Sequence, residues 1–204
     1  MRVTGKEVQA FWKYMAKKYD FKIVQKGDAE EMKIVGWALE VMDVQSKKDF
    51  LNNYTTTIII GEWRCVYVPF EIGKGSQAQL VSQIATCVHE CQHVVQADRE
   101  IGQPMKYLMS DASRAYYEAD AYRATMEMHF FFSGKLVSAK AIANGLKSYS
   151  IGKADRRIAE KHLVIAGKVV KRGGVITGTS KVAIKWWKRR KKTTKFRRVS
   201  LISA

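Results

Sequence analysis

The sequence predicts an α+β protein that is mostly helical, with a short β-hairpin and a basic helical extension at its C-terminal end. Apolar residues recur at helical spacing through most of the chain, and one run of β-branched residues indicates a hairpin. The last third of the chain carries the net positive charge. With 204 residues, 47% of them hydrophobic, the chain is long enough to bury one good core.

The N-terminal third is expected to form two helices and a short strand. Thr4 and Glu7 match a capping box, which marks the start of the first helix. Its apolar stripe consists of Val8, Phe11, Trp12, Met15 and Tyr19. A strand is expected at Phe21–Val24. A second helix is expected from Asp28, with an apolar side made of Met32, Val35, Leu39 and Met42.

A hairpin is expected next, with strands at Thr55–Ile60 and Arg64–Val68 and a turn at Gly61-Glu62. Two long helices follow it, from about Gln77 to Ala97 and from Ser113 to about Phe131. Further predicted elements are a turn-rich connector at Gly102-Gln103-Pro104, a stop at Ser133-Gly134, helices at about 138–147 and 154–171, a stop at Gly173-Gly174, and a short helix at about 179–190.

The pentapeptide His89-Glu90-Cys91-Gln92-His93 lies in the first long helix. Two imidazoles four residues apart stand on one face of a helix, about one turn apart, so one zinc ion can bind both. Glu90 then lies beside the open position of the metal, where its carboxylate can take a proton from a zinc-bound water. The motif predicts a zinc site with Glu90 as general base.

A catalytic zinc site takes three protein ligands, and the expected third ligand is Glu118 in the second long helix. Asp120 points elsewhere on that helix and is expected as a hydrogen-bond partner of a ligand imidazole. Asp111 is a weaker ligand candidate and is expected to cap the helix. Tyr122, one turn after Glu118, is the best aromatic candidate for stabilising an oxyanion, and ordinary packing is the alternative.

The HECQH pentapeptide on one helix and the segment Tyr117–Tyr122 (YEADAY) on the next resemble the gluzincin metallopeptidases. The resemblance spans about Thr55 to Phe132 and is to compact members, in which a short sheet precedes two metal-binding helices. It implies a zincin-like domain in residues 1–134 that hydrolyses peptide bonds, with His89, His93 and Glu118 as zinc ligands and Glu90 as general base. It also implies that an edge strand pairs with an extended peptide or protein substrate.

Other interpretations stay open. The motif can occur on a helix that binds no metal at all, or it can be a degenerate metal site that is kept for structure. The chain can also be a structural or binding protein on a protease-like scaffold, working through its basic tail. Small gluzincin-like domains with basic extensions resemble proteins encoded by phages and mobile elements. This analogy rests on the family and not on the residues of a site.

The cysteines predict a reducing compartment. Cys87 and Cys91 flank His89 two residues away on either side, so both point away from the histidine face. Three cysteines without a secretory signal indicate reduced thiols and a cytoplasmic location, or a virion-associated one if a phage encodes the chain. No apolar run approaches the ~18 residues of a membrane span.

Positive charge gathers in residues 135–204, which hold 20 of the 36 Lys and Arg residues and only two of the 19 acidic ones. This region is expected to be a basic helical extension that ends in a Lys/Arg-rich tail at 185–198. The tail is expected to bind nucleic acid or another polyanion without sequence specificity, and its aromatic residues can stack on bases. The same composition also suits an anionic membrane surface or an acidic protein partner, and a solvated tail without a ligand is the remaining alternative. The residues predicted to bind the polyanion are Lys188, Arg189, Arg190, Lys191, Lys192, Arg197 and Arg198.

Overall fold

The computed structural model describes residues 1–26, 55–60, 63–100 and 102–200, with only the backbone described at Ile60 and at 192–200. The described part is mostly helical with one small sheet, which confirms the α+β class. Its elements are α1 (Gly5–Tyr19), β1 (Lys22–Gln25), β2 (Thr56–Ile60), β3 (Trp63–Val68), α4 (Gln77–Arg99), α5 (Gln103–Met109), α6 (Asp111–Ser133), α7 (Ala139–Gly145), a 3-10 helix (Leu146–Tyr149), α8 (Lys153–Lys171) and α9 (Gly178–Ser200).

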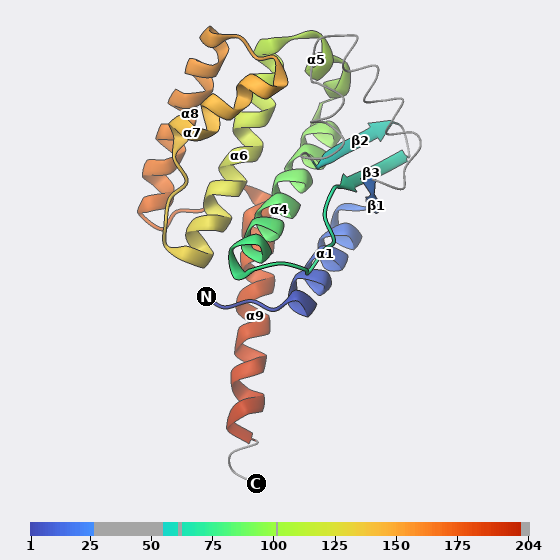
Figure 1. Cartoon of the computed structure of the whole chain (residues 1–204), viewed down its shortest axis with the longest axis vertical. Helices are drawn as coiled ribbons and strands as arrows, with labels where there is room; N and C mark the ends of the chain where they lie inside the picture. Colours follow the sequence, from blue (N-terminus) through green and yellow to red (C-terminus); the bar gives the residue numbers. More distant parts are fainter. Residues whose placement is uncertain (27–54, 61–62, 101, 201–204) are drawn as a thin grey trace.

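Helices α4 and α6 form the centre of the molecule (Figure 1). The sheet and α1 lie on one side of this pair, and α7 and α8 lie on the other. Helix α9 begins against the body, and its second half projects away from it. The central pair therefore stands between the two outer layers, and a site between α4 and α6 is enclosed by both.

The N-terminal elements largely follow the prediction. The Thr4–Glu7 capping box is present at the start of α1, and Val8, Phe11 and Trp12 are buried. Strand β1 begins one residue later than predicted. The helix predicted from Asp28 and the turn predicted at Gly61-Glu62 lie outside the described residues.

The predicted hairpin is confirmed, because β2 pairs with β3 in antiparallel fashion. Strand β1 pairs with the other side of β3 in parallel, which gives the order β1-β3-β2. Val66, Tyr67 and Val68 of the central strand are fully buried. Among the described strands β2 is thus an edge strand, and it lies next to α4.

The connector between the two long helices differs from the prediction. It holds the short helix α5, which starts after Gly102 in a left-handed conformation (φ 86) and has Pro104 in its first turn, where a proline is tolerated. Asp111 was the wrong choice of cap for α6. Ser110 accepts the hydrogen bond from the Ser113 amide, so Asp111 takes the first helical position.

The C-terminal helices match their predicted positions, except that α9 continues ten residues beyond its predicted end. Those ten residues contain neither glycine nor proline, so nothing in them stops a helix. The turn before α9 is held by Glu127 of α6, which is 2% exposed. Its carboxylate accepts hydrogen bonds from the backbone amides of Ile176 and Thr177 and from the Thr177 hydroxyl.

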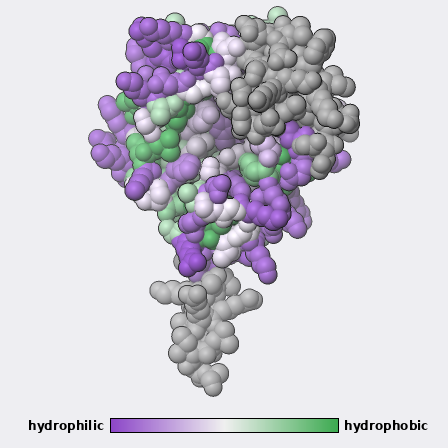
Figure 2. All heavy atoms as spheres, in the orientation of Figure 1, coloured by the Kyte–Doolittle hydropathy of each residue, from purple (hydrophilic) through white to green (hydrophobic). Residues whose placement is uncertain are grey.

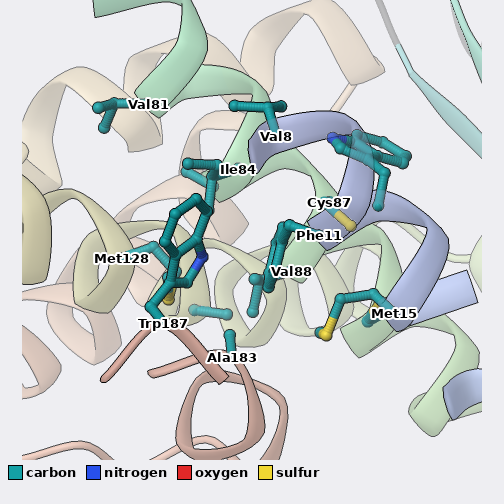
Figure 3. Packing of buried hydrophobic residues seen from close by; sticks show 14 of the residues in the cluster. Val8, Phe11, Met15, Val81, Ile84, Cys87, Val88, Met128, Ala183 and Trp187 are labelled. Atoms are coloured by element: carbon teal, nitrogen blue, oxygen red, sulfur yellow. The ribbon is translucent and has the colours of Figure 1, made fainter. Parts of the chain in front are cut away.

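The first half of α9 belongs to the main core of the protein. Trp187 is fully buried and packs among Phe11 of α1, Ile84 of α4 and Met128 of α6 (Figure 3). Its ring centroid lies 5.5 Å from that of Phe11. The division into domains 1–134 and 135–204 stays a prediction, but α9 shares its hydrophobic core with α1, α4 and α6.

The coloured part of the face drawn in Figure 2 is largely hydrophilic, with hydrophobic residues in separate groups. Within the described residues, no helix has the length and apolar character needed to cross a membrane.

Candidate metal centre

His89 and His93 stand one turn apart on α4, and Glu118 faces them from α6. The His89 and Glu118 side chains are buried and His93 is half-buried. Among the described residues, these three form a group whose ligand atoms converge closely enough to hold a metal ion. The structure thus brings together the three residues predicted as ligands.

The distances between the ligand atoms allow the three residues to share one ion. His89 Nε2 and His93 Nε2 are 3.1 Å apart. His89 Nε2 lies 3.5 Å from Glu118 Oε2, and His93 Nε2 lies 3.5 Å from Glu118 Oε1. A tetrahedral zinc with bonds of about 2.0–2.1 Å holds its ligand atoms about 3.3–3.4 Å from one another. Each of these pairs is thus close to that spacing, with the two imidazoles facing different oxygens of the carboxylate.

The hydrogen bonds of His93 turn its lone pair towards this centre. Its Nδ1 lies 2.9 Å from Gln96 Oε1. The Gln96 amide is oriented by its NH₂ group, which donates to the Tyr117 carbonyl and to Asp120 Oδ2. Because an amide oxygen can only accept, Nδ1 of His93 carries a proton, which leaves Nε2 as the ring nitrogen that can bind a metal ion.

His89 has a similar arrangement, with its Nδ1 3.2 Å from the hydroxyl of Thr125. When Nδ1–H donates to this hydroxyl, Nε2 of His89 also presents a lone pair. Burial lowers the pKa of His89, but Glu118 and Glu90 outweigh it and the pKa is raised overall. Without a metal ion, one ring can donate the hydrogen bond of 3.1 Å between the two Nε2 atoms, and a bound metal ion would replace that proton. The donor set of the two imidazoles therefore fits a metal ion.

Glu118 supplies an anionic oxygen to the same point. Its Oε1 accepts a hydrogen bond of 2.7 Å from the Tyr107 hydroxyl of α5. Its Oε2 is buried and accepts no hydrogen bond from the described part of the chain, which is costly for a carboxylate. Burial raises the pKa of Glu118, but the two imidazoles and Tyr107 outweigh it and the pKa is lowered overall. The carboxylate is thus anionic, and its Oε2 faces His89 Nε2 at 3.5 Å.

Glu90 lies beside the ligands, 4% exposed, and the sheet positions it. Its Oε2 accepts a hydrogen bond of 2.7 Å from the hydroxyl of Thr57 in β2. The neighbouring hydroxyl of Thr56 accepts from the buried Lys26 Nζ at 2.8 Å. Burial lowers the pKa of Lys26 to about 7, although the charge of Glu90 acts in the opposite direction. Strand β2 thus fixes one oxygen of Glu90.

Three tyrosines from separate elements surround the ligands. Tyr122 lies edge-on to His89, with ring centroids 4.7 Å apart, and its oxyanion role stays a prediction. Tyr107 binds Glu118 from α5. Burial raises the pKa of Tyr149, in the 3-10 helix, and so do the charges of Glu118, Tyr122 and Tyr107. Tyr107 and Tyr149 were not predicted from the sequence, because no local pattern connects them with the motif.

Asp120 supports His93 through another residue, not directly as expected. It accepts hydrogen bonds from the amide groups of Gln92, at 2.7 Å, and Gln96, at 3.0 Å. Gln96, three residues after His93 on the same helix face, is the direct partner of the imidazole. The Thr179 hydroxyl of α9 donates to the side-chain oxygen Oε1 of Gln92 at 2.9 Å, which connects the basic helix to the same network.

The residues predicted to bind a polyanion are in different situations. Lys188, Arg189 and Arg190 are exposed on α9. Lys191 instead donates to the backbone of Arg2 and forms an ion pair of 2.9 Å with Glu7, which offsets its charge. The remaining residues belong to α9, but their side chains lie outside the described part; they are Lys192, Arg197 and Arg198.

The tryptophans of this segment pack against other side chains of the protein, contrary to the expectation that they can stack on bases. Trp187 is fully buried. Trp186 packs against Phe11 and Tyr14, and Arg190 covers its ring at 5.2 Å. Apolar packing against α1 takes the ring faces that a base would need.

Comparison of the chain with protein-family models, curated proteins and solved structures finds no match.

Proposed function

We propose that the protein is a zinc-dependent peptidase of the gluzincin type, with a zincin-like fold in its first 134 residues. One observation carries the proposal: the ligand atoms of His89, His93 and Glu118 converge from two helices to within 4.8 Å of one another, and the buried Glu90 carboxylate is close enough to His89 to act on its charge. A general base beside an ion with three protein ligands is the arrangement that metal-assisted hydrolysis requires.

His89, His93 and Glu118 would hold the ion, and Gln96, Thr125 and Tyr107 would orient them. When bound, zinc supplies a Lewis acid that makes a water acidic enough to ionise near neutral pH.

Glu90 takes the proton of the attacking water and later returns it to the leaving amine. Its Oε2 is occupied by the Thr57 hydroxyl, so Oε1 is the oxygen we assign to proton transfer. A fixed carboxylate exchanges the proton without first rotating, which favours both transfer steps.

The position of β2 supports a peptide as the substrate. Among the described strands it is an edge strand next to α4, and its Thr57 contacts Glu90. An extended peptide that pairs with such an edge is held through its own backbone, because strand addition uses main-chain hydrogen bonds. Its scissile carbonyl would then lie near Glu90.

Metal removal tests the proposal. Dialysis against a chelator is expected to abolish cleavage of a mixed peptide substrate, and added Zn²⁺ is expected to restore it. Mg²⁺ is the control and is expected not to restore cleavage, because it prefers an octahedral set of oxygen ligands. Cleavage that persists unchanged in the chelated protein would overturn the proposal.

A further inference from the structure

A groove along the first half of α9 lies outside the candidate metal centre. It has a volume of about 320 Å³ and is lined by Val175, Lys181, Ile184, Lys185, Lys188 and Arg189, which we call the basic groove. Val175 comes from the turn before α9, and the other residues come from α9 itself. Two apolar residues and four cations thus share one concave surface.

The lysines of the basic groove form a row along one face of α9. Lys181, Lys185 and Lys188 follow one another at intervals of four and three residues, so all three lie on the same side of the helix. All three are exposed, and within the described residues none makes an ion pair. Lys191 differs from them because Glu7 balances its charge.

The spacing of this row matches an extended chain of phosphates. At a rise of about 1.5 Å per residue, the row extends about 10 Å along the helix axis. A nucleic-acid strand carries one phosphate per about 3.4 Å along a duplex axis, so the row covers about three phosphates. A groove lined by lysines can accept such a strand lengthwise.

The apolar residues of α9 argue against a membrane as the ligand. A helix that binds a bilayer surface presents a broad apolar face to the lipid. In α9 that face, with Ala183, Ile184 and Trp187, is buried in the core of the protein. Beside the four cations only Val175 and the edge of Ile184 line the groove, which is too little apolar surface to bind a bilayer, so the groove suits a hydrophilic polyanion.

We propose that the basic groove is a binding site for the phosphate backbone of nucleic acid. Lys181, Lys185, Lys188 and Arg189 neutralise successive phosphates and release their counterions. Contacts to phosphates carry no base information, so the site binds strands of any sequence. The sequence had placed polyanion binding in the tail from residue 185 onwards; Lys181 and the groove itself emerge from the fold. The inference does not depend on the proposed peptidase activity.

The test compares two triple variants of the full-length protein with the same net charge. The first changes Lys181, Lys185 and Lys188 to glutamine. The second is the control and changes three exposed lysines of α8, Lys161, Lys168 and Lys171, to glutamine. Both keep the C-terminal tail intact. Binding of a fluorescent single-stranded oligonucleotide is measured by anisotropy over a range of salt concentrations, and thermal unfolding checks that both variants are folded.

The groove variant is expected to bind about 10-fold more weakly or worse. The slope of log K against log[salt] is expected to become shallower by about two, since each lost phosphate contact on a single strand removes about 0.7 from the slope. The α8 variant is expected to stay close to the wild type. Equal weakening of both variants would overturn the proposal, because binding would then follow net charge alone. It would also be overturned if the groove substitutions weakened binding only to phosphatidylserine vesicles, or only to an acidic protein, and not to the oligonucleotide.

Discussion

Replacing Glu90 by glutamine is expected to lower peptide turnover by about 10²–10⁴-fold, because the variant loses its general base. Zinc binding is expected to be retained, since Glu90 is not one of the three converging ligand residues. Glutamine has the same shape and can still accept a hydrogen bond from Thr57 through its amide oxygen. The measurement is initial rates of peptide cleavage at equal zinc content.

A suitable control is Glu71→Gln, which makes the same chemical change at an exposed carboxylate paired with Lys74. This variant is expected to cleave peptides at the wild-type rate, because a surface ion pair contributes little. Wild-type turnover by Glu90→Gln would show that another group acts as the base and would remove the peptidase assignment in its present form.

Replacing Trp187 by alanine is expected to lower the free energy of unfolding by about 3–5 kcal/mol, the usual loss for a fully buried aromatic residue. The side chain is fully buried and contacts the rings of Phe11 and Phe132. Its indole NH has no hydrogen-bond partner within the described residues, so the loss comes mainly from packing, with a contribution from Lys191, whose Nζ lies 5.9 Å from the ring centroid. Denaturant unfolding followed by circular dichroism measures it.

Two further variants show whether packing is the cause. Trp187→Phe keeps most of the volume and is expected to cost clearly less than the alanine variant. Trp63→Ala removes an indole that is 47% exposed and is also expected to cost less. A loss below about 1 kcal/mol for Trp187→Ala would contradict the packing of α9 in the main core.

The candidate metal centre was predictable to the extent that local spacing determines how its residues converge. The helical interval between His89 and His93 fixes their common face, and the second long helix made Glu118 the natural third ligand. The residues that orient them were not predictable, because they come from elements far apart in the sequence. Thr57 reaches Glu90 from β2 and Tyr107 reaches Glu118 from α5. Only tertiary packing brings such side chains together.

The C-terminal region was predictable in its helices but not in its packing. Charge separates residues 135–204 from the rest of the chain, and this suggested a separate extension. The net charge comes from charged side chains and carries no information about the uncharged ones. Ala183, Ile184 and Trp187 of α9 are uncharged and buried. The buried apolar face, not the charge, decides where a helix packs.

The most direct test of the account is the zinc content of the purified wild-type protein beside His93→Ala, measured by elemental analysis. The account predicts one zinc ion per chain in the wild type and its loss in the variant, because His93 Nε2 is one of three converging donors. Wild-type protein that contains no zinc, even when purified with added zinc and without a chelator, would contradict the central claim.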